Sequence, residues 1–376
     1  MKKIFAYLRS QPIKILLIML PLAITSQYLS WGDLLTFILS ALAIIPLAGL
    51  IGDSTEALAA YTGPRIGGLL NATLGNAAEL IITIVAIREG LLELVLASIT
   101  GSILGNILLV MGMSFLLGGL KHGIQRFDRH HAGRNSILLM LAVIALVIPS
   151  VLSGSIGPVT SMRVEALSLG VAAIMIVLYG AGLVYSLKAT NGVLGPASVS
   201  LAAGSAQSEA KAPITRPAHG HAVWPLRTAL IVLALSTAGV GYMSELLVGA
   251  VGPVVTSLGV SEFFLGVILI PIIGNVAEHL VAVKVAIQNE MDLSVEIAIA
   301  SSLQIALFVA PLLVFISLLM GNPLHLVFNQ FELLALIAGI VIVALVAQDG
   351  ESNWLEGAEL LAVYVILAQA FFLLPV

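Results

Sequence analysis

The chain has 376 residues, of which 59% are hydrophobic and only 10% are charged. An ordinary soluble domain carries about 25% charged residues, so the composition excludes a soluble protein and indicates a chain that crosses the membrane many times. The net charge of -4 distinguishes no function by itself, and the absence of cysteine excludes disulfides and thiol chemistry.

Long apolar runs follow one another along almost the whole chain. A helix needs about 20 mainly apolar residues to cross a bilayer, and the continuous Leu, Ile, Ala and Val runs favour helices over the alternating strands of a membrane barrel. We predict an all-α polytopic membrane protein with 11 transmembrane helices, which leaves no room for a soluble catalytic domain. The expected spans are 13–30, 34–52, 66–88, 92–120, 133–154, 164–187, 225–251, 262–287, 293–320, 328–348 and 354–375.

The first run resembles a signal peptide, because basic residues precede an apolar core. The small-residue cleavage pattern that should follow is weak, so residues 1–32 are predicted to form an extra N-terminal transmembrane helix. With the N-terminus in the cytoplasm, all lysine and arginine residues except Arg88 and Arg163 fall on the cytoplasmic side. The positive-inside rule therefore predicts a cytoplasmic N-terminus and a C-terminus on the opposite side.

Residues 188–223 are rich in Ala, Ser, Gly and Pro and are predicted to form a flexible cytoplasmic linker. The linker separates two sets of five helices, 33–187 and 224–376. At an offset of 199 residues, GGLLNATLGNAAE (67–79) and GVILIPIIGNVAE (266–278) agree at six of thirteen positions. A five-helix unit crosses the membrane an odd number of times, so the second repeat is inverted relative to the first. Inverted repeats are typical of secondary transporters, which bind their substrates near the bilayer midplane.

Each repeat places one glutamate, Glu79 or Glu278, inside an apolar helix. An ionised acid at a helix centre costs about 2.5 to 3.5 kcal/mol on insertion scales, so such an acid faces a cavity or a partner. Asn76 and Asn275 precede the acids by three residues and share a helix face with them. We therefore expect both acids and both amides to meet at one central site.

Other polar and flexible positions surround this pair of motifs. Gly75 and Gly274 precede the amides and are expected to allow local unwinding that turns backbone carbonyls inward. Pro271 should weaken the second helix further. Equivalent hydroxyl groups and nearby amides on the following helices complete the predicted site: Ser102, Ser301, Asn106 and Gln304.

Carboxylate, amide and carbonyl oxygens form an oxygen-only site that suits a hard cation such as Ca²⁺, whereas softer metals prefer His or Cys. The two acids should hold protons when the site is empty, and a divalent cation should favour their ionised forms. Ca²⁺ and protons would then compete at Glu79 and Glu278, which predicts antiport. We expect no cofactor and no nucleic-acid partner; Ca²⁺ and protons are the cargo. Mn²⁺ or another divalent cation, membrane lipids and an oligomer are compatible with the sequence.

Several residues have alternative interpretations. Glu56 and Glu245 lie at opposite membrane faces and could gather cations at two mouths, although a solvated helix end explains them nearly as well. His279 points about 100° away from Glu278, so packing or proton tuning is favoured over metal binding. A passive cation channel remains an alternative function. An intramembrane hydrolase is the least favoured function, because the sequence shows neither a plausible Ser/His pair near the acids nor a metal-binding helix.

The motifs GNAAEL (75–80) and GNVAEH (274–279), with SSLQIALFVAP (301–311) and GESNWLEG (350–357), resemble the calcium/proton exchangers of the Ca²⁺/cation antiporter superfamily. The resemblance covers nearly the whole chain and implies an extra N-terminal helix followed by two inverted five-helix repeats. It implies that the first helix of each repeat acts as a sliding gate. The site residues that it implies are Glu79 and Glu278 as carriers of Ca²⁺ and protons, surrounded by Asn76, Asn275, Ser102, Ser301 and Gln304.

Sodium/calcium relatives place Thr or Ser before the key glutamate and carry an extra carboxylate on a later helix. This chain has Asn76, Asn275 and Gln304 at the corresponding positions, which favours protons over sodium. A sodium-driven Ca²⁺ exchanger is the second function compatible with the resemblance. The compact size and short linker favour a prokaryotic plasma membrane.

Overall fold

The computed structural model describes residues 12–189 and 224–374, and almost all of its regular structure is helical. Residues 1–11 of the predicted N-terminal helix and residues 190–223 of the predicted linker lie outside the described residues. The first half contains η1 (Pro12–Ile18), α2 (Met19–Tyr28), α3 (Asp33–Leu74), α4 (Ala77–Arg88), α5 (Leu92–Leu104), η2 (Gly105–Val110), α6 (Met111–His122), β1 (Gln125–Arg126), α7 (Arg129–Ile156) and α8 (Met162–Ala189). The second half contains α9 (Leu226–Gly249), α10 (Val251–Leu258), α11 (Glu262–Phe264), η3 (Leu265–Leu269), α12 (Ile270–Ile287), α13 (Met291–Gln304), η4 (Ile305–Val309), α14 (Ala310–Leu319), α15 (Gln330–Val346), β2 (Glu351–Ser352) and α16 (Trp354–Phe372).

Eight helices within the described residues are long and apolar enough to cross a membrane, and two shorter apolar helices, Ile13–Tyr28 and Gln330–Val346, accompany them. The prediction of an all-helical membrane protein is therefore confirmed, apart from one pair of two-residue strands. The expected span 66–88 is not among the eight because a turn at residues 75–76 divides it. The count of eleven spans stays a prediction.

The long helix α3 is not one straight rod. A Cβ atom placed on Gly67 would lie 2.8 Å from the Cβ of Ala59, whereas residues eight apart on a straight helix lie about 12 Å apart along its axis. The chain therefore folds back between these two residues. The candidate span within α3 accordingly ends at Thr62, and the remainder of α3 continues toward α4 as the first part of the expected span 66–88.

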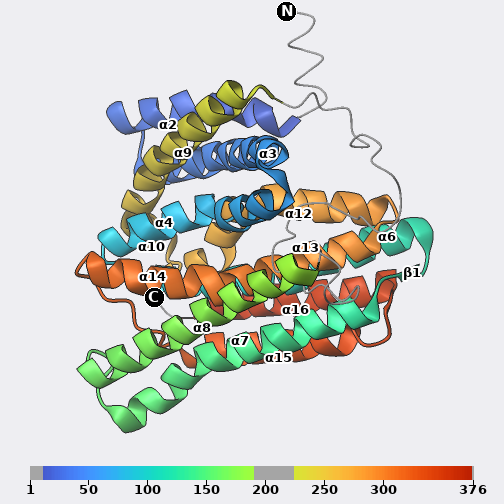
Figure 1. The fold of residues 1–376 in the computed structure, drawn as a ribbon. Coiled ribbons are helices and arrows are strands. Elements are labelled where there is room, and N and C mark those ends of the chain that lie inside the picture. The colour runs from blue at the N-terminus through green and yellow to red at the C-terminus, as the bar shows by residue number, and fades with distance from the viewer. Residues whose placement is uncertain (1–11, 190–223, 375–376) are drawn as a thin grey trace, which may run out of the picture.

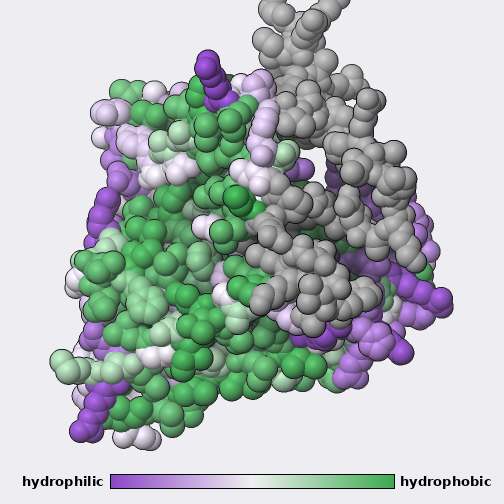
Figure 2. All heavy atoms as spheres, in the orientation of Figure 1, coloured by the Kyte–Doolittle hydropathy of each residue, from purple (hydrophilic) through white to green (hydrophobic). Residues whose placement is uncertain are grey.

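The helices form layers. Figure 1 shows α2, α3 and α9 along one side of the molecule and α7, α8 and α15 along the opposite side, with α4, α12 and α13 between them. The outer helices α7 and α8 expose large apolar side chains at helical spacing, such as Ile137, Leu141, Ile144 and Ile148. In Figure 2 hydrophobic residues cover the middle of the visible face and hydrophilic residues gather at its left and right margins. This distribution suits a lipid bilayer crossed by helices that run between the two margins.

Loops from the two halves meet at one margin. Strand β1 pairs antiparallel with β2, with Gln125 opposite Ser352, and Arg126 forms an ion pair of 3.1 Å with Glu351. Asp128 ends this loop by accepting hydrogen bonds from the backbone of His131 and His130 at the start of α7. These backbone donors hold the pKa of the Asp128 carboxyl below its usual value.

Candidate cation and proton site

The two acids predicted from the repeat differ in their position along the helix and in their burial. Glu79 is in the first turn of α4, immediately after the turn at residues 75–76, and is 1% exposed. Glu278 lies in the middle of α12 and is half-buried. The expected break at Gly274 is wrong, because α12 runs without interruption from Ile270 to Ile287. Pro271 lies directly after the π-helical turn η3 (Leu265–Leu269), and the helix continues through it from Glu262 to Ile287 without a break.

Each acid accepts a hydrogen bond from the equivalent serine of its own half. Ser102 Oγ on α5 donates to Glu79 Oε1. Ser301 Oγ on α13 donates to Glu278 Oε2 at 3.0 Å. The offset of 199 residues that relates the two acids also relates these two serines, so the contacts match in both halves.

The two asparagines reach across to the other half of the chain. Asn275 Nδ2 donates to Glu79 Oε2 at 3.4 Å, and Asn76 Nδ2 donates to Gln304 Oε1 at 2.7 Å. The side-chain oxygens of Asn76 and Asn275 are buried and accept no hydrogen bond within the described residues. Two amide oxygens at the centre of the protein are therefore available to a ligand.

Asn106 connects a further residue to the second acid. Its Nδ2 donates to Ser301 Oγ at 3.0 Å, and its Oδ1 lies 3.1 Å from His279 Nε2. His279 thus reaches Glu278 through Asn106 and Ser301. Sequence spacing shows only that His279 points away from Glu278; it carries no signal that a second helix meets the imidazole there.

The glycines before each asparagine pack against the acid of the other half. A Cβ atom on Gly75 would lie 3.2 Å from Glu278 Oε1, and a Cβ atom on Gly274 would lie 3.5 Å from the Cβ of Glu79. The two motifs are therefore in contact with each other at one site. Single π-helical turns, η2 and η4, follow the two serines at corresponding positions, and such turns are frequent at functional sites.

The donor groups at this site are carboxylate, amide and hydroxyl. No group of three or more His, Asp or Glu side chains suited to a metal ion occurs in residues 12–189 and 224–374. The hydrogen bonds to Glu79 and Glu278 come only from neutral groups, and none of the ion pairs in the described residues involves either acid. Such a site can balance its negative charge by taking up a hard cation or protons.

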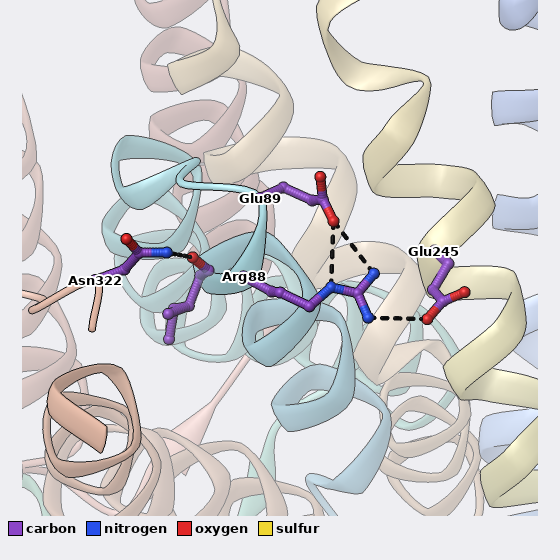
Figure 3. Close-up of polar contacts among 5 residues, drawn as sticks. Arg88, Glu89, Glu245 and Asn322 are labelled. Carbon is purple, nitrogen blue, oxygen red and sulfur yellow. Dashed lines mark hydrogen bonds and ion pairs between the residues drawn. The ribbon is translucent and has the colours of Figure 1, made fainter. Parts of the chain in front are cut away.

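The predicted mouth acids lie outside this cluster. Glu56 is exposed on α3. Glu245 on α9 forms an ion pair of 3.0 Å with Arg88, whose guanidinium also contacts Glu89 at 3.2 Å. Figure 3 shows Arg88 at the end of α4 reaching between these two carboxylates. Sequence reasoning missed this contact, because nothing in the spacing of residues 88 and 245 indicates that they meet.

The fold and the site define an integral membrane protein of the transporter class. Residues 33–188 and 228–373 match the family described as sodium/calcium exchanger protein, and the chain belongs to this family. The chain is 45% identical over 355 residues to the Ca(2+)/H(+) antiporter ChaA of Bacillus subtilis (strain 168), covering 94% of this chain and 96% of the relative. It is 42% identical over 362 residues to a Ca(2+)/H(+) antiporter of Aphanothece halophytica, covering 96% of each. Its fold matches the solved structure of native YfkE with a TM-score of 0.80 and 42% identity, covering 96% of this chain and 100% of that one.

Proposed function

We propose that this chain is a secondary antiporter that moves Ca²⁺ out of the cytoplasm in exchange for protons. The observation that carries the proposal is the pair of acids, Glu79 and Glu278, whose hydrogen-bond partners are all neutral. The open side-chain oxygens belong to Asn76, the N-cap residue of α4, and to Asn275 on α12, each three residues before the acid of its own half. A low-dielectric site with two unpaired carboxylates is stable only when a cation or protons compensate their charge.

Competition at this pair couples the two ions. Both acids must be ionised to bind Ca²⁺ through oxygen, whereas the empty site favours protonated acids. Replacing one Ca²⁺ by two protons leaves the net charge of the pair unchanged. The negative charge of the two carboxylates is therefore balanced with either cargo. The site can face either side of the membrane when it holds one Ca²⁺ or two protons. The relatives named Ca²⁺/H⁺ antiporters, which align over nearly their whole length, support this cargo.

Alternating access follows from the proposed layout of 11 spans. In this layout residues 1–32 form an extra helix, residues 188–223 form a cytoplasmic linker, and residues 33–187 and 224–376 form two inverted repeats. The matched serine contacts and the matched π-turns support the repeats. The pairing of β1 with β2 supports the layout, because it joins two loops that we assign to the cytoplasmic side. The N-terminus is cytoplasmic in this proposal, and the C-terminus lies on the opposite side.

Purified protein in sodium-free liposomes tests the function. Vesicles with an acidic lumen should accumulate radioactive Ca²⁺ from the medium, because protons leaving the lumen drive Ca²⁺ inward. A protonophore with valinomycin and potassium, which collapses the gradient, should stop the accumulation. An absolute requirement for sodium would replace the proposal with a sodium-driven exchanger. Ca²⁺ flux that carries no protons in return would replace it with a passive channel.

A further inference from the structure

The two halves differ in how far their central helices are covered. Ile82 on α4 is 1% exposed, whereas Val281, the residue at the equivalent position on α12, is 47% exposed, and its neighbour Leu280 is 46% exposed. The segment of α4 beyond Glu79 is thus enclosed by neighbouring helices. The segment of α12 beyond Glu278 is less covered, although Ala282, Val285 and Ala286 on it are buried. This difference is the pattern expected of a state that is closed at the face toward which α4 runs and open at the face toward which α12 runs.

Polar contacts hold the closed face together. Arg88 at the end of α4 forms the ion pair with Glu245 on α9 (Figure 3). Helix α9 belongs to the layer of α2 and α3 (Figure 1). Asn322 Nδ2 donates to the carbonyl oxygen of Ile87 at 2.9 Å and so binds the same end of α4. We name Arg88 and Glu245 the outer latch. It joins α4, which carries Glu79, to a helix of the layer that covers it.

The open face contains an oppositely charged pair at matching heights. Helices α3 and α12 touch at Gly49 and Ala277, since a Cβ atom on Gly49 would lie 4.0 Å from the Cβ of Ala277. Seven residues further along each helix, two turns toward the open face, are Glu56 and Lys284. A step of seven residues returns to nearly the same side of a helix, so these two side chains extend from the sides on which α3 and α12 meet.

Glu56 and Lys284 are apart in this state. Both are exposed, and neither forms an ion pair within the described part of the chain. We name them the inner latch. Because both side chains extend from the facing sides of α3 and α12, two turns beyond the contact at Gly49, a movement of this part of α3 toward α12 would bring the carboxylate and the ammonium group together.

We propose that the outer latch and the inner latch form alternately, so that one ion pair closes each mouth of the transport path in turn. This inference rests on the proposed function, because it requires a site that opens to one side at a time. In the state described here Arg88 and Glu245 are joined and Glu56 and Lys284 are separate. In the opposite state the layer of α3 and α9 moves, the outer pair separates, and the inner pair forms.

Cysteine cross-linking tests the alternation, because the natural chain contains no cysteine. One variant carries Arg88→Cys with Glu245→Cys, a second carries Glu56→Cys with Lys284→Cys, and a third carries all four changes. A bifunctional thiol reagent with a short reducible spacer spans the length of an ion pair better than a direct disulfide, which requires closely spaced Cα atoms. Mass spectrometry of the cleaved protein measures the yield of each bridge.

A matched control pair lies inside the covering layer. Lys14 and Asp53 form an ion pair of 2.8 Å between η1 and α3 and do not span either mouth. The variant Lys14→Cys with Asp53→Cys should therefore cross-link under all conditions and keep its transport rate.

The alternation predicts that no molecule of the four-cysteine variant carries both bridges. Arg88→Gln, added to the inner cysteine pair, should raise the inner yield about two- to five-fold, as expected for the loss of one exposed ion pair that favours the outer-closed state. Either bridge should stop exchange until a reductant releases it. Both bridges on one molecule, an unchanged inner yield with Arg88→Gln, or exchange through a bridged outer latch would overturn the inference. The yields are read without any transport assay, so a wild-type protein that failed to exchange Ca²⁺ for protons would refute the proposed function and leave the latches testable.

Discussion

At the scale of single residues, the hydroxyl groups of Ser102 and Ser301 set the orientation of the two acids. Each hydroxyl donates one hydrogen bond to the carboxylate of its own half. The carboxylate can accept further hydrogen bonds or bind a cation. A hydrogen bond to a charged group contributes about 1.5 to 3 kcal/mol, because the ionised form is stabilised more than the neutral one. The serines therefore favour the ionised acids that bind Ca²⁺.

Replacing either serine by alanine should weaken Ca²⁺ binding. Loss of one such bond at Glu79 or Glu278 should raise the dissociation constant about 10- to 100-fold, since about 1.4 kcal/mol corresponds to a factor of ten. Calorimetric titration of Ser102→Ala and Ser301→Ala with Ca²⁺ measures the change. Ser98→Ala is the control, because Ser98 Oγ on the same helix as Ser102 is buried without a hydrogen-bond partner in the described residues. Equal affinities in all three variants would contradict the role of the two hydroxyls.

The repeat made it predictable that these residues meet, because one offset of 199 residues relates both acids, both asparagines and both serines. The partners of these residues were not predictable. Asn76 binds Gln304 while Asn275 binds Glu79, so the two equivalent amides differ in their contacts. A sequence repeat defines which residues correspond, whereas the state in which the two halves pack decides which of them touch.

At the scale of helices, close packing of α5 against the end of η3 and the start of α12 brings Ser102 to the second half. Gly101 faces the backbone carbonyl of Val267, and a Cβ atom on it would lie 2.7 Å from Cγ of Pro271. A side chain at this position would push the two helices apart. Small residues allow such close approaches between membrane helices.

Gly101→Ala should therefore lower the thermal stability of the protein in detergent. The clash with backbone and ring atoms cannot be relieved by turning a flexible side chain, and overpacking of this kind costs about 1 to 3 kcal/mol. Gly170→Ala on α8 is the matched control, because a Cβ atom there meets nothing within 4 Å. The control should melt at or above the temperature of the natural protein, since alanine is the better helix former. A Gly101→Ala protein as stable as the control would show that the approach of these helices is looser than described.

The limits of most helices were predictable to within a few residues, because apolar runs long enough for a bilayer leave little freedom in where a span begins. For example, the expected span 354–375 corresponds to α16 at Trp354–Phe372. The expected span 34–52 is an exception, since the helix continues to Thr62. Irregular backbone was less predictable. The turn at residues 75–76 begins at Gly75 as expected, yet Gly274 lies within a continuous helix. The same glycine motif thus has two backbone conformations, and neighbouring helices determine which one occurs.

At the scale of the whole molecule, two halves share one candidate site and differ in how far their central helices are exposed. The composition and the charge distribution suffice to predict a membrane protein and its proposed orientation, and the paired motifs suffice to predict where the halves meet. They do not show which face is open, because exposure depends on the position of the layer formed by α2, α3 and α9. The contact between Arg88 and Glu245 also depends on how this layer packs against α4. No local sequence pattern indicates it.

The most direct test of the central claim is the number of protons released when Ca²⁺ binds. Calorimetric titrations in buffers of different ionisation enthalpy count these protons. Repeating the titrations from acidic to alkaline pH shows over which pH range the protons are released. Protons occupy the carboxylates at low pH, so the account predicts that Ca²⁺ binding weakens as the pH falls and releases up to two protons in the acidic range.

The variants Glu79→Gln and Glu278→Gln should each lose Ca²⁺ binding together with the coupled proton release. Glu332→Gln is the matched control, because Glu332 is also a buried acid but accepts its hydrogen bonds from Thr100 and the backbone of Asn329, neither of which hydrogen-bonds to Glu79 or Glu278. This variant should bind Ca²⁺ and release protons as the natural protein does. Ca²⁺ binding that releases no protons at any pH, or that survives in both of the other variants, would contradict the account.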